Sequence, residues 1–375
     1  MKDNKHGGHR LEKTARRELL PLVIIFAILA AISLSSLILP DRQFSPNENR
    51  YLEQRPQFTL QNLFSGKYTA AAAEYTADQI VLRDFWMETA STTQQAMGKQ
   101  EINNTWLGAD GHYFAKVTPD TFDGKQYRKN LQQVEKFFET NADKSCHLLM
   151  APTPAYMLSE LLPQNAQLFD ADSCFDAMTD QFGSRFIDTR RVLTDPSCYY
   201  RTDHHWTTEG ALAAYGVWCE ATDHEVRNWT LEQVSDSFRG TLYSQVMLPS
   251  SAYDSLSIAP DVEVTSVNSD GEMSDSIYSM EALEEKDHYK IFMGGNYAKV
   301  IITTGADTGR DLLLIKDSFA NSFVPFLTED YDTITLLDLR HCREEVQAIA
   351  DGCTDVLVLY ELTNFASDNN LFKLN

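Results

Sequence analysis

The sequence has few basic residues and lacks the patterns of several common protein classes. Its 375 residues include 32 Lys and Arg against 54 Asp and Glu, which gives a net charge of −22. A chain this acidic repels phosphate groups, which argues against nucleic acid or anionic lipid as a partner of the main domain. The six cysteines show no CxxC spacing, so a zinc ribbon is not expected, and no internal repeat is present. A neutral ligand such as a glycan remains compatible with the composition.

One long apolar run lies near the N-terminus. Leu19 to Leu39 is 21 residues long and contains no charged residue. At about 1.5 Å per residue, a helix of this length crosses a bilayer core of roughly 30 Å. A cleaved signal peptide usually has a shorter apolar region, of about 7–15 residues, so we expect a retained anchor; cleavage after a small residue such as Ser33 or Ser35 is the alternative. The basic excess in residues 1–18 predicts that this tail is cytoplasmic. We therefore expect a single-pass protein of the cell membrane, whose residues after the anchor lie outside the cytoplasm.

All six cysteines follow the anchor. An even count in a domain outside the cytoplasm permits up to three disulfides. The simplest pairing joins sequence neighbours: Cys146–Cys174, Cys198–Cys219 and Cys342–Cys353.

The residues after the anchor divide into a linker and a larger domain. Residues 41–100 are expected to form a juxtamembrane linker, with a helix from Tyr68 to about Met97. In residues 101–375, short apolar runs alternate with helical stretches, which is typical of an α/β domain with a mostly parallel sheet covered on both faces. The predicted strands are His147–Ala151, Phe186–Asp188, Leu312–Ile315, Thr333–Leu337 and Val356–Leu359, and the predicted helices are Gln126–Asn141, Glu209–Cys219 and Arg343–Ala350. Residues 222–290 are polar and acidic and are expected to form an insertion over the sheet.

The segment YYRTDHHWTTEGA, residues 199–211, combines a carboxylate with two imidazoles. In an extended segment, residues two apart point to the same side, so Asp203 and His205 converge while His204 faces away. A carboxylate beside an imidazole is what a general base requires. Two alternatives are a structural His pair stacked on Trp206 with Asp203 as a cap, and a metal site formed by the three polar residues, although adjacent histidines rarely reach one ion.

A second segment, DLLLIKDSFANSFVPFL at residues 311–327, places Ser318 directly after a buried strand. Ligand sites of α/β proteins form at this end of parallel strands, where a helix N-terminus offers N–H groups to a developing oxyanion. The alternative is that Ser318 only caps the helix. The Asp-x-His segment in the same domain favours a nucleophile, because a serine needs a base.

Together, TDHHW at 202–206 and KDSF at 316–319 resemble the bacterial DHHW protein family, which is similar to the alginate O-acetyltransferase-like branch of the SGNH hydrolase superfamily. Further supporting tracts are SPNENRYL at 45–52, ADQIVLRDFW at 77–86, GADGHYF at 108–114, MGGNY at 293–297 and LLLIKDSFANSFVPF at 312–326. The resemblance implies a flavodoxin-like sheet and a site acting on an acyl ester, with Ser318 as nucleophile, His205 as base and Asp203 as orienting acid. The motif order is permuted, because ordinary SGNH hydrolases place the serine first.

The resemblance also implies an oxyanion-binding segment. The corresponding Asn of ordinary members follows the third strand of the scheme, and ELTNF at 361–365 occupies that place. Asn364 is therefore the expected oxyanion donor, with Glu361 and Thr363 also in range, although the usual GxND pattern is absent. Lys316 stands where ordinary members carry Gly, so it either crowds the Ser turn or helps to hold a substrate.

Three further residues are candidates for substrate binding. Asn296 lies in the MGGNY tract, which is most simply a turn. Arg201 can contact an anionic sugar, although an ion pair is the simpler expectation. Trp206 can stack on a sugar ring.

The expected function is acyl transfer, most simply of acetyl, to or from a cell-surface or exported polysaccharide. Neither a cofactor nor a metal is expected, and related systems imply that a multi-pass membrane acyltransferase supplies the acyl donor. If water resolves the acyl-enzyme, the same three residues make a carbohydrate esterase or deacetylase. A non-catalytic glycan-binding envelope protein with the same fold is the remaining alternative.

Overall fold

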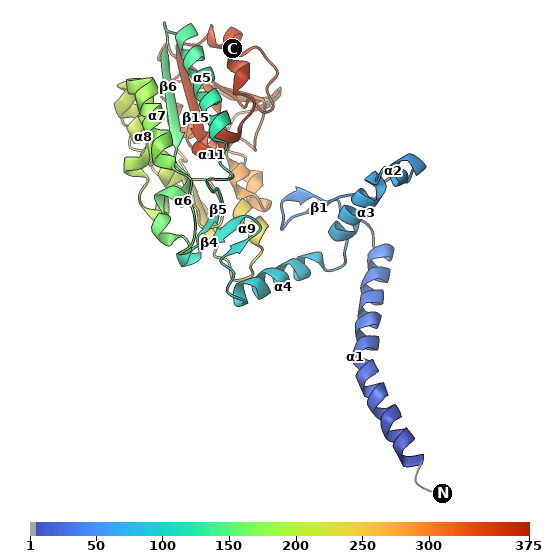
Figure 1. Ribbon diagram of the computed structural model, residues 1–375. Helices are drawn as coiled ribbons and strands as arrows, with labels where there is room; N and C mark the ends of the chain where they lie inside the picture. Colours follow the sequence, from blue (N-terminus) through green and yellow to red (C-terminus); the bar gives the residue numbers. More distant parts are fainter. Residues whose placement is uncertain (1–4) are drawn as a thin grey trace. The chain divides into compact units, whose positions relative to one another are not determined.

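The computed structural model describes the backbone of residues 5–375 and the side chains from residue 19 onward (Figure 1). Packing contacts divide the chain into two units, residues 1–93 and residues 94–375.

The first unit begins with helix α1 (Lys5–Ile38). Its stretch Leu19–Ile38 is 20 residues long, and its length and apolar composition suffice to cross a membrane. The elements that follow are β1 (Phe44–Ser45), β2 (Arg50–Tyr51), α2 (Leu60–Phe64), α3 (Lys67–Asp78) and α4 (Arg83–Ala96). The single helix predicted from Tyr68 to Met97 is therefore two helices. The break is fixed by Leu82, whose φ of 59° lies in the left-handed region that interrupts a right-handed helix.

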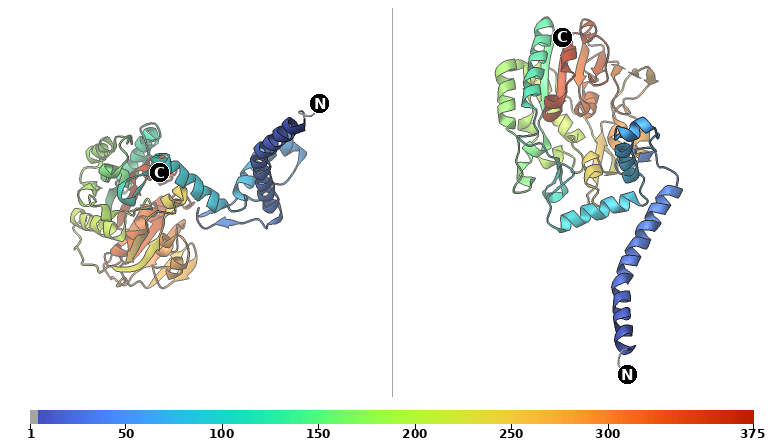
Figure 2. Two further views of the ribbon diagram at one scale, coloured as in Figure 1. Left: turned by 90° about the horizontal axis from the view of Figure 1, so that it is seen from below. Right: turned by 45° about the vertical axis from the view of Figure 1, so that its right-hand side comes forward.

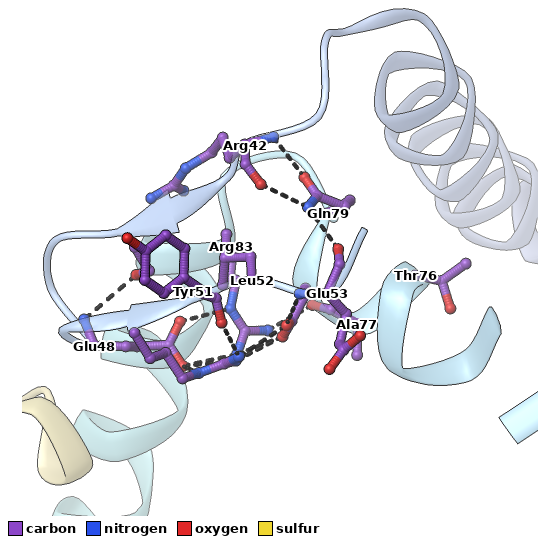
Figure 3. Close-up of polar contacts among 12 residues, drawn as sticks. Arg42, Glu48, Tyr51, Leu52, Glu53, Thr76, Ala77, Gln79 and Arg83 are labelled. Atoms are coloured by element: carbon purple, nitrogen blue, oxygen red, sulfur yellow. Dashed lines mark hydrogen bonds and ion pairs between the residues drawn. The ribbon is translucent and has the colours of Figure 1, made fainter. Parts of the chain in front are cut away.

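Ion pairs and hydrogen bonds hold the β1–β2 hairpin to these helices (Figure 3). Arg50 donates to both carboxylate oxygens of Asp78, at 2.8 and 2.6 Å. Arg83 donates to both oxygens of Glu48, at 2.8 and 2.9 Å. Gln79, in the break between the helices, donates to the carbonyl oxygens of Arg42 and Glu53. The SPNENRYL tract thus supplies Glu48 and Arg50, whose partners Arg83 and Asp78 lie in α4 and α3.

The second unit is built on an eight-stranded sheet with the order β11-β10-β12-β14-β13-β15-β6-β7. Strands β14, β13, β15, β6 and β7 pair in parallel, whereas β12, β10 and β11 continue the sheet with antiparallel pairing. The bounds are β6 (Ser145–Ala151), β7 (Phe186–Asp188), β10 (Ser266–Ser269), β11 (Glu272–Ser274), β12 (Lys299–Thr303), β13 (Asp311–Lys316), β14 (Thr333–Leu337) and β15 (Asp355–Glu361). The predicted α/β class with a mostly parallel sheet is confirmed, and all five predicted strands lie in it.

Helices cover both faces of this sheet (Figures 1 and 2). Successive strand residues point to opposite faces. Leu312 and Leu314 pack on the side of α8 (Thr208–Thr222), and Leu313 and Ile315 pack on the other side. The helices of that other side are α5 (Gly124–Thr140), α7 (Ala171–Phe182), α10 (Val346–Ala350) and α11 (Leu362–Ser367). Smaller elements of the unit are β3 (Glu101–Ile102), β4 (Thr105–Leu107), β5 (Tyr113–Ala115) and α6 (Pro154–Met157).

The acidic segment 222–290, predicted as an insertion over the sheet, also contributes strands to the sheet. Its strands β10 and β11 extend the sheet at one edge. It also forms an antiparallel ribbon of β8 (Glu232–Phe238) and β9 (Asp254–Ile258), with α9 (Thr241–Val246) between these strands. Two 3₁₀ turns, Met280–Glu284 and His288–Ile291, lie near its C-terminal end. This ribbon and helix contact the DHHW loop, as described below.

The six cysteines form no disulfide. The predicted pairing is wrong. For Cys146 and Cys174 the reason is that each thiol donates to a different backbone carbonyl group near its own element. Cys146 donates to the carbonyl oxygen of Asn141, and Cys174 donates to that of Asp170. Burial raises the pKa of both thiols to about 11, which keeps them protonated and unreactive at neutral pH.

Candidate active site

Ser318, His205 and Asp203 form a continuous hydrogen-bonded chain. Ser318 Oγ lies 2.8 Å from His205 Nε2, although the two residues are 113 positions apart in the sequence. His205 Nδ1 lies 2.6 Å from Asp203 Oδ1. Because Nδ1 faces a carboxylate, it carries the proton, and Nε2 is left to accept from the serine hydroxyl. This is the arrangement in which an imidazole can remove the proton of an attacking serine.

The turn after β13 presents Ser318 to His205. Asp317 caps this 3₁₀ turn, Ser318–Ser322, by accepting from the backbone N–H of Phe319 at 2.9 Å. The cap of this turn is therefore Asp317, whereas the alternative from the sequence was that Ser318 only caps the helix. The Ser318 hydroxyl is left to interact with His205, and its side chain is half-buried.

Asp203 is fixed by four hydrogen bonds. Its Oδ1 accepts from the ring and the backbone N–H of His205, and its Oδ2 accepts from the backbone N–H and hydroxyl of Thr241, at 2.7 and 2.5 Å. Gly240 permits this approach, because a Cβ there would lie 2.1 Å from Asp203 Oδ2. Burial alone would raise the pKa of Asp203, but the imidazoles of His204 and His205 and the donated hydrogen bonds bring it well below its usual value. The carboxylate therefore stays ionised and can stabilise a charged His205.

Aromatic rings hold the plane of His205. Tyr289 stacks on its ring at 3.9 Å between centroids, and the Tyr289 hydroxyl donates to the carbonyl oxygen of Ser318 at 3.0 Å. The ring of His204 also lies 3.9 Å from that of His205. His204 was expected to face away, but residues 201–205 form bends rather than a strand, so the alternation of a strand does not apply. Burial lowers the pKa of His204 to about 4, so its ring is neutral at physiological pH.

The metal-site alternative involves the same residues. Potential ligand atoms of Asp203, His204 and His205 lie within 4.8 Å of one another. Both ring nitrogens of His205 are already directed at Asp203 and Ser318, and His204 Nδ1 contacts the Thr241 hydroxyl at 2.8 Å. A metal ion here would have to displace the hydrogen bonds of the serine–histidine–aspartate chain.

A cavity of about 250 Å³ adjoins these residues. This volume far exceeds the roughly 10–15 Å³ that a single water requires. Its lining includes His204 and Phe319, the sequence neighbours of His205 and Ser318. The other lining residues are Ala115, Val117, Thr153, Pro154, Ala155, Leu168, Phe169, Thr241, Leu242, Gln245, Glu361, Thr363 and Asn364. The segment expected to bind an oxyanion therefore lines the cavity.

Asn364 is tied to the turn that carries Ser318. Its Nδ2 donates to Asp317 Oδ2 at 2.8 Å, and the backbone N–H of Glu361 donates to the same oxygen at 3.0 Å. A side-chain amide has two hydrogens, so one remains for a ligand when the other is donated to Asp317.

Comparison with known proteins agrees with the motifs. The family model described as DHHW protein matches residues 174–337, a span that contains both TDHHW and KDSF. The resemblance to the DHHW family is confirmed. Among solved structures, a DHHW family protein from Eubacterium siraeum DSM 15702 is 22% identical with a TM-score of 0.59, over 73% of this chain and 95% of that one. Bacillus cereus PatB1 with a sulfonyl adduct is 20% identical with a TM-score of 0.60, over 72% of this chain and 97% of that one. At these identities the solved structures show a shared fold. No curated protein matches the chain.

Lys316 and Asn296, two of the other predicted site residues, do not line this cavity. Lys316 is fully buried, and its Nζ donates to Asn321 Oδ1 at 2.5 Å. Asn321 in turn donates to Asn296 Oδ1 at 3.2 Å. Burial lowers the pKa of Lys316 to about 8. Lys316 and Asn296 thus belong to one chain of polar side chains, which runs from the buried Lys316 through Asn321 to the exposed Asn296.

The DHHW tryptophan and the arginine before the motif are also structural. Trp206 is fully buried, and its Nε1 donates to the carbonyl oxygen of Phe319 and to Ser322 Oγ, both at 2.9 Å. Arg201 forms an ion pair with Asp254 at 3.5 Å, the simpler of its two expected roles. Neither side chain lines the cavity.

Several supporting residues carry no sequence signal. Asp254 Oδ2 accepts from the backbone N–H and hydroxyl of Thr202, across 52 positions of the chain. Gly240, Thr241 and Tyr289 also lie in the acidic segment, far from DHHW in the sequence. Gly240 and Thr241 reach the site through the start of α9, and Tyr289 reaches it through the 3₁₀ turn His288–Ile291. No local sequence motif predicts these contacts.

Proposed function

We propose that the protein is a membrane-tethered O-acyltransferase that acts outside the cytoplasm and acetylates hydroxyl groups of a cell-surface or exported polysaccharide. The observation that carries the proposal is the hydrogen-bonded chain Ser318–His205–Asp203 beside a cavity. The choice of acetyl and of a polysaccharide rests on the resemblance to the alginate O-acetyltransferase-like branch.

The geometry supports a two-step transfer. Ser318 Oγ attacks the carbonyl carbon of the donor ester while His205 Nε2 takes its proton, and His205 then gives that proton to the departing alcohol. In the second step an acceptor hydroxyl loses its proton to His205 and attacks the acyl-enzyme. The new ester forms as the bond to Ser318 Oγ breaks, and His205 returns the proton to that oxygen. The Asp203 carboxylate stabilises the charged imidazole in both steps. We assign Asn364 as the oxyanion donor, because this residue lines the cavity and its amide keeps one hydrogen for a ligand beside the one donated to Asp317.

The anchor gives this chemistry a location. With residues 1–18 in the cytoplasm and the stretch Leu19–Ile38 of α1 crossing the membrane, the second unit would lie outside the cytoplasm, near the membrane surface. A multi-pass membrane acyltransferase is the proposed source of acyl groups at that surface.

Turnover of p-nitrophenyl acetate by the purified protein tests the nucleophile. We expect Ser318→Ala to lower turnover by at least about 10³-fold, because the acyl-enzyme cannot form. Ser255→Ala changes an exposed serine on β9 and is the matched control. A sulfonyl fluoride should label Ser318, as detected by peptide mass spectrometry. Unaltered turnover in Ser318→Ala would show that Ser318 is not the nucleophile. Addition of glycans, with acetylated products detected by mass, separates a transferase from an esterase.

A further inference from the structure

Glu361, the last residue of β15, is a buried carboxyl group that the two-step transfer does not use. Its Oε2 accepts three hydrogen bonds, from the backbone N–H and hydroxyl of Thr363 and from the backbone N–H of Asn364, at 3.0, 2.7 and 2.9 Å. Its Oε1 is also buried, yet it has no hydrogen-bond partner among the residues that the structure describes. Buried polar atoms are nearly always paired, so this oxygen is placed to meet a group from outside the chain.

The sheet register brings Glu361 to the site. Lys316 on β13 pairs with Leu359 on β15, and these two strands are parallel neighbours. Ser318 and Glu361 each follow that pair by two positions, so both lie at the carboxyl ends of adjacent parallel strands. Neighbouring strands are about 4.8 Å apart. Glu361 also lines the cavity, together with Asn364 and Phe319.

We propose that Glu361 is a specificity-determining residue whose Oε1 accepts a hydrogen bond from a second hydroxyl of the acyl acceptor, next to the hydroxyl that attacks the acyl-enzyme. This inference rests on the proposed function and names its acceptor class as a vicinal diol, as found in a sugar ring. No covalent bond to Glu361 forms or breaks. His205 handles the proton of the attacking hydroxyl, and Glu361 holds the neighbouring one.

The charges around Glu361 give this contact a pH dependence. Burial raises the pKa of Glu361 to about 7, and the nearby Asp317 carboxylate acts in the same direction, while the donors of Thr363 and Asn364 oppose it. Two other titratable groups face this region. Burial raises the pKa of Tyr199 well above its usual value. Burial also lowers the pKa of His204, which lines the same cavity, to about 4, so both groups are neutral near pH 7. The ionised carboxylate is the stronger acceptor, so the contact strengthens as the pH rises through about 7.

Two three-carbon primary alcohols, one with and one without a vicinal hydroxyl, test the contact. The full-length protein in detergent is acylated with p-nitrophenyl acetate, and equal concentrations of glycerol and 1-propanol compete for the acyl group. Both present a primary hydroxyl to the acyl-enzyme, but only glycerol has a vicinal hydroxyl for Glu361. The ratio of the two ester products is measured at pH 6 and pH 8.5, and it cancels any effect of pH on the common acyl-enzyme.

We expect the wild type to prefer glycerol, with a preference that is several-fold larger at pH 8.5 than at pH 6. In Glu361→Gln the amide oxygen can keep the bonds to Thr363 and Asn364, but an N–H₂ group replaces Oε1, so the pH dependence of the ratio should disappear. Glu139→Gln removes the same charge from an exposed position on α5 and should keep the wild-type ratio and its pH dependence.

Two results would overturn the proposal. One is a wild-type ratio that does not change with pH, and the other is a Glu361→Gln ratio that follows the wild type at both pH values. Failure of the proposed function looks different, because then no acyl group is transferred from a Ser318-dependent intermediate to either alcohol or to water.

Discussion

The close contact between Gly240 and Asp203 allows one residue outside the DHHW motif to be tested by adding a single methyl group. Gly240 has φ −84° and ψ −160°, an extended conformation that alanine adopts without backbone strain. Its added Cβ would lie 2.1 Å from Asp203 Oδ2 and 2.3 Å from Asp203 Cβ. Since non-bonded carbon atoms pack at about 3.5–4.0 Å, the side chain of Asp203 or the start of α9 must move by at least about 1 Å.

This displacement breaks the pair of hydrogen bonds from Thr241 to Asp203 and shifts the partner of His205. A misplacement of about 1 Å at a catalytic group can cost about 10²-fold in rate, and that is the expected fall in kcat for p-nitrophenyl acetate. Overpacking of a buried site costs about 1–3 kcal/mol, and this should appear in the free energy of unfolding by urea.

Gly216→Ala is the matched control. Gly216 lies in α8, and apart from its chain neighbours and the backbone of its own helix no atom comes within 4 Å of its added Cβ. Turnover should be unchanged, and stability should rise by about 0.5–1 kcal/mol, because alanine favours a helix interior over glycine. A Gly240→Ala protein with the turnover of the wild type would refute the argument that Asp203 must stay in place.

Three further predictions follow from the contacts described above. Asp203→Asn should lower kcat by roughly 10²–10⁴-fold, because a neutral amide cannot stabilise the charged form of His205; circular dichroism checks that the variant folds. Because all six cysteines are unpaired, dithiothreitol should leave the midpoint of thermal unfolding unchanged, and a lower midpoint would reveal a disulfide. The hydrogen bond from Arg50 lowers the pKa of Asp78 from 3.8 to about 2, so its stabilisation is complete above pH 3.8 and is lost as the pH falls through about 2. Asp78→Asn should therefore lose less stability than the wild type when the pH falls from 5 to 2, as measured by thermal unfolding of the first unit.

The sequence was most informative where one short segment contains the whole pattern. Strands Phe186–Asp188 and Thr333–Leu337 were predicted with their observed bounds, because each is a compact apolar run. The Asp-x-His spacing and the Ser after a buried strand similarly led to the three residues that the structure brings together.

Predictions failed where a side chain's partner lies far away in the sequence. The position of Lys316 beside the Ser turn suggested a substrate contact, but its Nζ turns inward to Asn321. Trp206 was a candidate for stacking on a sugar ring, but its indole N–H donates to the carbonyl oxygen of Phe319 in the turn that begins at Ser318, more than 100 positions away. The role of Gly240 is equally invisible in the sequence, because only the folded ribbon places it against Asp203.

The last strand in the sequence occupies the middle of the sheet. Strand β15 lies between β13 and β6, so the parallel pairing from β14 to β7 is incomplete until residues 355–361 are present. During synthesis, β6 and β13 therefore have no common neighbour until residues 355–361 have been made. Because Glu361 and Asn364 arrive with or just after this strand, a chain truncated before residue 355 would contain the serine, the histidine and the aspartate without a complete site. Under the proposed function, activity would therefore require that β15 has joined the sheet, and a protein truncated before residue 355 should not turn over p-nitrophenyl acetate.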